Sequence, residues 1–266
     1  MIKYMIMDLD GTLLNDIEEI GDLTVKEILR LRSEGMHFII ASGRRLAGII
    51  EYAKVLNFGK DDYIISCDGE YIYDGAYKEI WRNKFISQKE LNQIINSNIK
   101  GKIIVFTQKN DFIFNVKFFE KLVRKVWYWY KKNERIIFAT RTDLIRGNVE
   151  KIRIGANNMG DIVESLSSLT FHKVFDKYID ITSENVNKLY AIALILRKLK
   201  VSESEVVYFG DDYNDIECFT NLHNTVAVKN AQEEILKKAK FITASNNENG
   251  VGWFLTKIKE GSIFDD

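Results

Sequence analysis

Short apolar runs that alternate with amphipathic segments constrain the fold of this chain more than any other feature. Nearly continuous apolar runs predict three strands, at residues 2–8, 36–42 and 62–67. Helical patterns separate them at residues 23–35 and 44–59, and the first helix opens with Thr24 and Glu27 in the spacing of a capping box. This order of strands and helices predicts an α/β fold, in which helices cover both faces of a parallel sheet.

The alternation changes in character after about residue 81. Residues 102–116 have the pattern of a hairpin around the sequence QKND. Further short strands, separated by helical segments, are predicted at residues 150–156, 171–175 and 177–183. The middle of the chain is therefore predicted to be an α+β insert at about residues 83–182, with a partly antiparallel sheet.

The rhythm of strands and helices returns from about Asn187. Helices are predicted at residues 188–200, 231–239 and 250–258, and strands at 205–212, 225–228 and 241–244. The simplest organisation is a parallel-sheet core of residues 1–82 and 183–266 that is interrupted by the insert.

Two aspartates, Asp8 and Asp10, end the first predicted strand, and Gly11 allows a sharp turn after them. Ligands of open α/β sheets bind outside the carboxyl ends of the strands, so both carboxylates point at the expected site. Because like charges this close repel each other, they imply a cation, a shared proton, or both. A second acidic cluster, GDDYND at residues 210–215, follows another predicted strand. Oxygen-rich clusters without His or Cys suit a hard cation such as Mg²⁺.

Two other strand ends carry groups that suit an anion. Ser42 and Gly43 end the second predicted strand just before a predicted helix, where backbone N–H groups and the helix dipole favour negative charge. Lys188 lies at the start of a helix, where the dipole disfavours a cation unless an anion is also present. A phosphate shared by these groups would remove that conflict.

Together these motifs resemble the haloacid dehalogenase-like phosphohydrolase superfamily, and within it the Cof-type phosphatases with a large α/β cap. The resemblance runs nearly end to end, through DLDGTLLN at 8–15, IIASGR at 39–44, Lys188, GDDYND at 210–215 and the closing stretch at 226–255. It implies a Rossmann-like parallel core with an inserted α+β cap domain.

The resemblance also implies roles for single residues. Asp8 would attack a phosphoryl group and form an aspartyl-phosphate. Asp10 would protonate the leaving oxygen and then activate water. Asp8, the backbone carbonyl of Asp10 and Asp211 would hold Mg²⁺, with support from Asp215. The substrate phosphate would lie among Ser42, Gly43, Lys188 and Asn214, with Arg44 and Thr12 as further candidate contacts.

The chain departs from the family pattern at two places. Cys67, Asp68, Gly69 and Glu70 follow the third predicted strand, where relatives commonly have Asn-Gly-Ala. Leu189 follows Lys188, where relatives often have glycine. Both places lie near the expected substrate, so they bear on substrate identity rather than on catalysis.

Two alternative functions remain open beside a Mg²⁺-dependent phosphatase for small phosphorylated metabolites. A phosphosugar mutase on the same scaffold would form an isomer instead of inorganic phosphate. A non-catalytic phosphometabolite-binding protein would bind ligand without Mg²⁺-dependent phosphate release, but pure binding needs neither a nucleophile nor an acid/base pair.

Composition argues against several other classes. With 38 basic and 38 acidic residues, no net charge attracts the chain to nucleic acid or to an anionic membrane. The two cysteines fit a reducing compartment, and an apolar strand at the N-terminus leaves no room for a signal peptide, so we expect a cytoplasmic protein without an obligate protein partner. The basic and aromatic stretch at 117–132 is expected to be a helix of the cap domain.

The three histidines, His37, His172 and His223, do not have the spacing of metal ligands.

Overall fold

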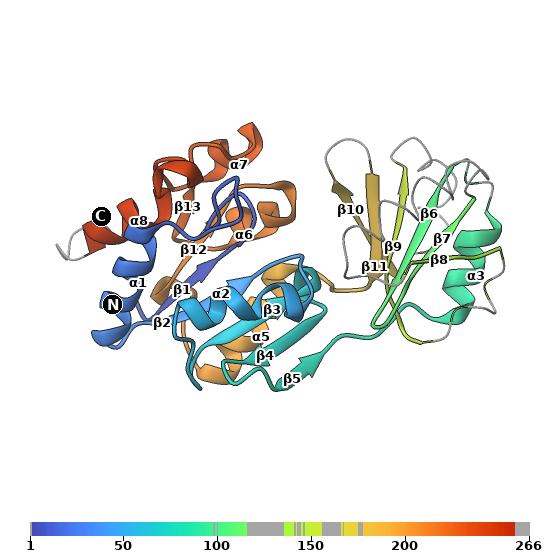
Figure 1. The fold of residues 1–266 in the computed structure, drawn as a ribbon, viewed down its shortest axis with the longest axis horizontal. Coiled ribbons are helices and arrows are strands. Elements are labelled where there is room, and N and C mark those ends of the chain that lie inside the picture. The colour runs from blue at the N-terminus through green and yellow to red at the C-terminus, as the bar shows by residue number, and fades with distance from the viewer. Residues whose placement is uncertain are drawn as a thin grey trace. The chain divides into compact units, whose positions relative to one another are not determined.

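The computed structural model describes residues 2–97, 99, 101–115, 136–140, 142, 145, 147–155, 166, 168–174 and 178–258. The chain divides into two compact units (Figure 1). The first unit combines residues 1–82 with 186–266, and the second unit is residues 83–185. The helix expected at 117–132 lies outside the described residues. Among those that are described, no helix is long and apolar enough to cross a membrane.

An eight-stranded sheet forms the centre of the first unit, in the order β14-β13-β12-β1-β2-β3-β4-β5. Its strands are β1 Tyr4–Met7, β2 His37–Ala41, β3 Tyr63–Ser66, β4 Tyr71–Asp74, β5 Glu79–Arg82, β12 Val206–Gly210, β13 Thr225–Ala227 and β14 Phe241–Ile242. The strands from β14 to β3 are parallel, and β4 and β5 add an antiparallel edge. Every residue of β1, β3 and β12 is buried, as the apolar runs predicted.

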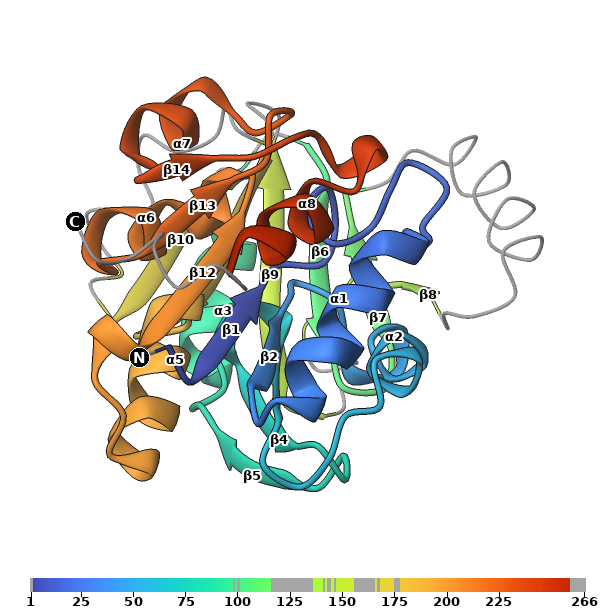
Figure 2. The ribbon, with the colours of Figure 1, turned by 90° about the vertical axis from the view of Figure 1, so that its left-hand side faces the viewer.

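Helices cover this sheet, and α1 lies beside α8 (Figure 2). The helices of the first unit are α1 Asp22–Ser33, α2 Ile50–Val55, α5 Lys188–Leu199, α6 Ile216–Asn221, α7 Glu233–Lys238 and α8 Gly250–Lys257. The predicted α/β fold is confirmed by this architecture. The chain leaves β1 toward β2 and returns on the other side through β12, so the ends of these three strands meet at a topological switch point.

Two local predictions in the first unit were wrong, and one hairpin was missed. The Thr24 and Glu27 capping box does not form, because α1 begins earlier, after Gly21. The Thr24 hydroxyl instead accepts a hydrogen bond from the Gly252 backbone N–H of α8, at 3.2 Å. The helix predicted at 44–59 is only α2 with a short 3₁₀ turn before it. The β4–β5 hairpin was missed, since its half-exposed strands lack a long apolar run.

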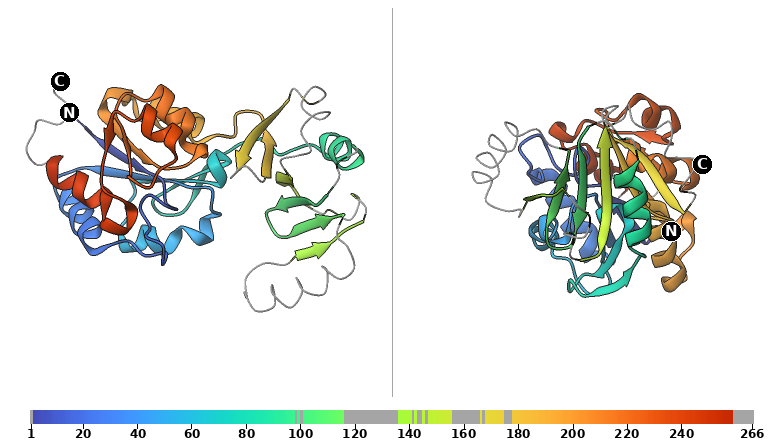
Figure 3. Two further views of the ribbon diagram at one scale, coloured as in Figure 1. Left: turned by 90° about the horizontal axis from the view of Figure 1, so that it is seen from above. Right: turned by 90° about the vertical axis from the view of Figure 1, so that its right-hand side faces the viewer.

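The second unit has a six-stranded sheet in the order β10-β11-β9-β6-β7-β8. Its elements are α3 Gln88–Asn96, β6 Ile103–Thr107, β7 Asp111–Phe114, β8 Ile136–Phe138, β9 Val149–Gly155, β10 Leu169–Val174 and β11 Tyr178–Ser183. The pairs are antiparallel except β7 with β8, so the expected partly antiparallel insert is confirmed. The helix α3 lies against this sheet (Figure 3). Its Leu91 and Ile94 join the core of the second unit.

Candidate active site

Four segments of the first unit bring polar side chains to one edge of its sheet. Asp8 directly follows β1, Ser42 follows β2, and Asp211 follows β12. Lys188 is the first residue of α5, which Asn187 caps through a hydrogen bond from the Tyr190 backbone N–H at 2.7 Å. Because β1 lies between β2 and β12, strand ends that are distant in sequence meet around Asp8.

Lys188 is the central cation of the site, and its side chain is fully buried. Its Nζ atom lies 2.5 Å from Asp8 Oδ1 and 2.7 Å from Asp215 Oδ1. Burial alone would lower the pKa of Lys188, but the carboxylates of Asp215 and Asp8 outweigh it and hold that pKa well above its ordinary value. The lysine is therefore charged, and the third N–H of its ammonium group is left for a ligand.

Asp215 is fully buried and accepts hydrogen bonds on both carboxylate oxygens. Oδ1 accepts from Lys188 and, at 2.6 Å, from the Tyr208 hydroxyl. Oδ2 accepts from the backbone N–H groups of Asp211 and Asp212, at 2.9 and 3.2 Å. Asp215 therefore fixes both the lysine and the loop that carries Asp211. The sequence motif pointed to Asp215, whereas Tyr208, inside a buried strand, was missed.

Asp211 is held against the turn that follows Asp8. Its Oδ1 accepts a hydrogen bond from the Thr12 hydroxyl at 2.6 Å. Gly11 has a φ of +79°, and a Cβ atom there would lie 2.4 Å from Asp211 Oδ2, so a larger residue would displace the carboxylate. Burial, followed by the charge of Asp215, raises the pKa of Asp211 to about 7. In this structure the Thr12 hydroxyl thus orients the Asp211 carboxylate.

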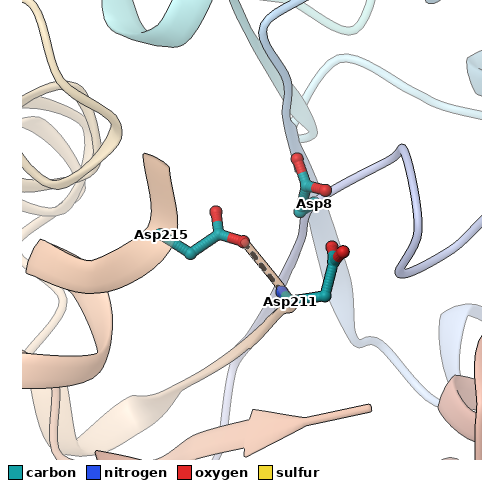
Figure 4. Close-up of side chains that lie close together, drawn as sticks. All are labelled: Asp8, Asp211 and Asp215. Atoms are coloured by element: carbon teal, nitrogen blue, oxygen red, sulfur yellow. Dashed lines mark hydrogen bonds between the residues drawn. The ribbon is translucent and has the colours of Figure 1, made fainter. Parts of the chain in front are cut away.

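The three carboxylates Asp8, Asp211 and Asp215 converge, and each offers an oxygen within 4.8 Å of the others (Figure 4). Burial raises the pKa of Asp8 well above its usual value, against the opposing effect of Lys188. Negative charge is therefore in excess here, and a hard divalent cation would offset it. The all-oxygen donors of Asp8 and Asp211 fit such an ion. Asp215 supports them, because its oxygens are already hydrogen bonded.

Asp10 lies outside this buried cluster, and its side chain is 54% exposed. Arg44 binds it with two nitrogen atoms: Nε lies 2.9 Å from Asp10 Oδ2, and an Nη atom lies 2.5 Å from Oδ1. Tyr52 packs against the Arg44 guanidinium from α2. The resemblance made Arg44 a candidate contact to the substrate phosphate, and in the structure Arg44 pairs with Asp10.

The predicted anion site at Ser42 differs from a helix N-terminus. No helix starts directly after Gly43, and the Ser42 backbone N–H donates to the Ile65 carbonyl within the sheet. The Ser42 hydroxyl oxygen accepts the Arg44 backbone N–H at 3.1 Å, which leaves the hydroxyl proton for a ligand. The predicted helix start just after Gly43 was therefore wrong, and phosphate binding by Ser42 and Gly43 stays a prediction.

Asn214 follows β12 in the 3₁₀ turn Tyr213–Asp215. The side-chain amide of Asn214 donates to Asp68 Oδ1 at 3.0 Å. The sequence had assigned Asn214 to the substrate or to the orientation of Lys188. The departure from the family pattern at Asp68 was visible in the sequence, but this contact was not.

The first unit is a parallel α/β core in which carboxylates surround a buried lysine at the switch point of the sheet. A family model described as haloacid dehalogenase-like hydrolase matches residues 5–255. The chain therefore belongs to the haloacid dehalogenase-like hydrolases.

Individual relatives extend this result. The 5-amino-6-(5-phospho-D-ribitylamino)uracil phosphatase YcsE of Bacillus subtilis is 27% identical over 251 residues, which cover 94% of this chain and 93% of that protein. A haloacid dehalogenase-like hydrolase from Bacteroides thetaiotaomicron superposes with a TM-score of 0.76 at 23% identity, covering 97% and 100% of the chains. A sugar phosphatase of subclass IIB superposes with a TM-score of 0.77 at 19% identity, covering 97% and 99%. The two structures share the fold of this chain.

Proposed function

We propose that this protein is a Mg²⁺-dependent phosphatase that acts in the cytoplasm on small phosphorylated metabolites. One observation carries the proposal: the carboxylate of Asp8 lies beside the buried cation Lys188 and next to Asp211. A buried aspartate in contact with a lysine and with further carboxylates suits phosphoryl transfer, where charge must be compensated on both the nucleophile and the phosphate.

In the proposed reaction, an Asp8 oxygen attacks phosphorus and the ester P–O bond breaks. Asp10 gives its proton to the leaving oxygen, so an alcohol and an aspartyl-phosphate result. Asp10 then takes a proton from water, whose oxygen attacks the same phosphorus and releases phosphate and free Asp8. The Lys188 ammonium and the Ser42 hydroxyl donate hydrogen bonds to the phosphoryl oxygens. Mg²⁺, held by Asp8 and Asp211, would neutralise part of the negative charge on the phosphate.

The substrate class rests on the names of relatives. One is a phosphatase of 5-amino-6-(5-phospho-D-ribitylamino)uracil, and another is a sugar phosphatase. Both names describe small phosphate esters, which supports a sugar phosphate or a similar phosphomonoester as the substrate of this chain.

The test is phosphate release from a panel of phosphate esters, with and without Mg²⁺. We expect Asp8→Asn to lose activity at least about thousandfold, because the amide is a poor nucleophile. Asp16→Asn is a matched control, since Asp16 lies in the same loop but accepts a hydrogen bond from Asn247, at 3.0 Å, outside the site. Substantial activity of Asp8→Asn contradicts the proposal. ³¹P NMR of the products distinguishes a mutase, which would form an isomeric ester.

A further inference from the structure

Asp68 lies in a turn with unusual backbone geometry. Cys67, Asp68 and Gly69 all have positive φ values, 51°, 55° and 105°. Two of the three are not glycine, and each such residue costs roughly 1 kcal/mol or more of strain. Backbone strain of this kind persists only where the surroundings enforce it.

Contacts with two neighbouring segments fix this turn. The Asp68 backbone N–H donates to the Ser42 carbonyl at 3.1 Å, and that of Cys67 donates to the Arg44 carbonyl at 3.0 Å. On the other side, a Cβ atom at Gly69 would lie 2.3 Å from the Asn187 carbonyl oxygen, next to Lys188. The backbone that carries the Asp68 side chain is therefore held in place by both neighbouring segments.

The Asp68 carboxylate lies against the proposed phosphate site. A Cβ atom at Gly43 would be 3.0 Å from Asp68 Oδ2, so the carboxylate packs closely against the backbone of Gly43. Asn214 donates to Oδ1. Among the residues that the structure describes, Oδ2 has no hydrogen-bond partner. The half-buried carboxylate thus keeps one oxygen that can accept a hydrogen bond from a ligand.

The charges around Asp68 Oδ2 favour a hydrogen-bond donor next to this oxygen and disfavour another anion. In the contacts described above, Lys188 and Arg44 pair with carboxylates at this edge of the sheet, and the carboxylates outnumber them; they are Asp8, Asp10, Asp68, Asp211 and Asp215. A phosphoryl group held by Ser42 and Lys188 would add negative charge beside Asp68. A hydrogen-bond donor on the alcohol part of the ester would relieve that repulsion.

We infer that Asp68 determines substrate specificity by accepting a hydrogen bond from a hydroxyl or ammonium group next to the ester linkage. The inference rests on the proposed phosphatase function. The preferred substrates are then phosphate esters of amino alcohols and polyols, with the ammonium group favoured most because it carries a compensating charge. Esters of simple alcohols leave Asp68 beside the phosphate without a donor, and they react more slowly.

The test compares kcat/KM for three esters of similar size: 2-aminoethyl phosphate, 2-hydroxyethyl phosphate and propyl phosphate. The wild-type protein is expected to prefer the first over the third by at least about tenfold, the effect of one hydrogen bond to a charged group. Asp68→Asn keeps the shape and tolerates the left-handed backbone, and we expect it to reduce this preference about tenfold.

Glu18→Gln is the matched control, because it removes one carboxylate that is 3.6 Å from Arg44 and not beside Gly43. It is expected to keep the wild-type preference. Equal kcat/KM for the three esters in the wild-type protein overturns the inference, and so does an unchanged preference in folded Asp68→Asn. If Asp68→Asn does not fold, the wild-type comparison decides alone. Hydrolysis of none of the esters, nor of p-nitrophenyl phosphate, overturns the proposed function and this inference with it.

Discussion

Replacing Asp215 with asparagine tests how the site is held together. The substitution keeps the size of the side chain but exchanges one acceptor oxygen for an NH₂ group. Turned one way, the NH₂ group faces two donors, the backbone N–H groups of Asp211 and Asp212. Turned the other way, it faces Lys188 Nζ, which is also a donor, and the Tyr208 hydroxyl, which can reverse its hydrogen bond and accept. Up to two hydrogen bonds are therefore lost, and Lys188 keeps only one carboxylate.

The size of the effect follows from these contacts. A hydrogen bond to a charged group contributes about 1.5–3 kcal/mol, so two give about 3–6 kcal/mol. A second estimate agrees with this range, because removing one partner of a buried ion pair costs about 3–5 kcal/mol. We expect Asp215→Asn to lower the free energy of unfolding of the first unit by about 3–5 kcal/mol, a large part of the stability of an ordinary domain.

Hydrogen exchange of peptides from β1 and β12 is the suitable assay, since the chain has two compact units and a single unfolding curve would mix them. Tyr208→Phe is the matched control. It removes one donor and leaves Lys188 on the same oxygen, so we expect a loss of about 1.5–3 kcal/mol, the contribution of one hydrogen bond to a charged group. A loss in Asp215→Asn no larger than that in Tyr208→Phe would refute the role of Asp215 as the centre of the network.

Three other predictions concern the metal and Asp10. The pKa of Asp211 is about 7 in the metal-free protein, so a proton competes with a cation for this carboxylate. The rise in Tm caused by Mg²⁺ should therefore grow from pH 5.5 to 7.5 and level off above pH 7.5. An equal or larger rise in Tm at pH 5.5 would contradict this. Arg44→Lys keeps the charge but loses the two-nitrogen grip on Asp10, so kcat should fall about tenfold with little change in KM, whereas an unchanged kcat would count against this role. Gly11→Ala should weaken Mg²⁺ binding about tenfold in calorimetry, because the new Cβ would lie 2.4 Å from Asp211 Oδ2. Gly35→Ala is the control, because Gly35 also has a positive φ but has open space around it. Equal Mg²⁺ affinities of the two variants would contradict the steric argument.

Much of the core could be predicted because its signals are local. A strand buried on both faces must be apolar along its length, so β1, β2, β3 and β12 are visible in the sequence. The hairpin of β4 and β5 has no such run, since its strands lie at the edge of the sheet and are partly exposed. The capping box predicted at Thr24 does not form, because α1 begins before Thr24. The Thr24 hydroxyl accepts a hydrogen bond from Gly252 of α8, a tertiary contact that no local pattern shows.

The sequence by itself determined which residue types stand at the strand ends. Asp8, Asp10 and Asp211 follow apolar runs directly, so the order of the chain places them at the carboxyl edge of the sheet. It also showed that the residues around Asp68 depart from the family pattern.

Only the tertiary structure decided which of these side chains touch. Lys188 meets Asp8 across 180 positions of the chain, and Arg44 binds Asp10. These pairings depend on β1 lying between β2 and β12, an order that no local pattern encodes. The physical reason is that the apolar pattern of a segment reflects how deeply that segment is buried, whereas the partner of a buried charge is set by the strand that folds beside it.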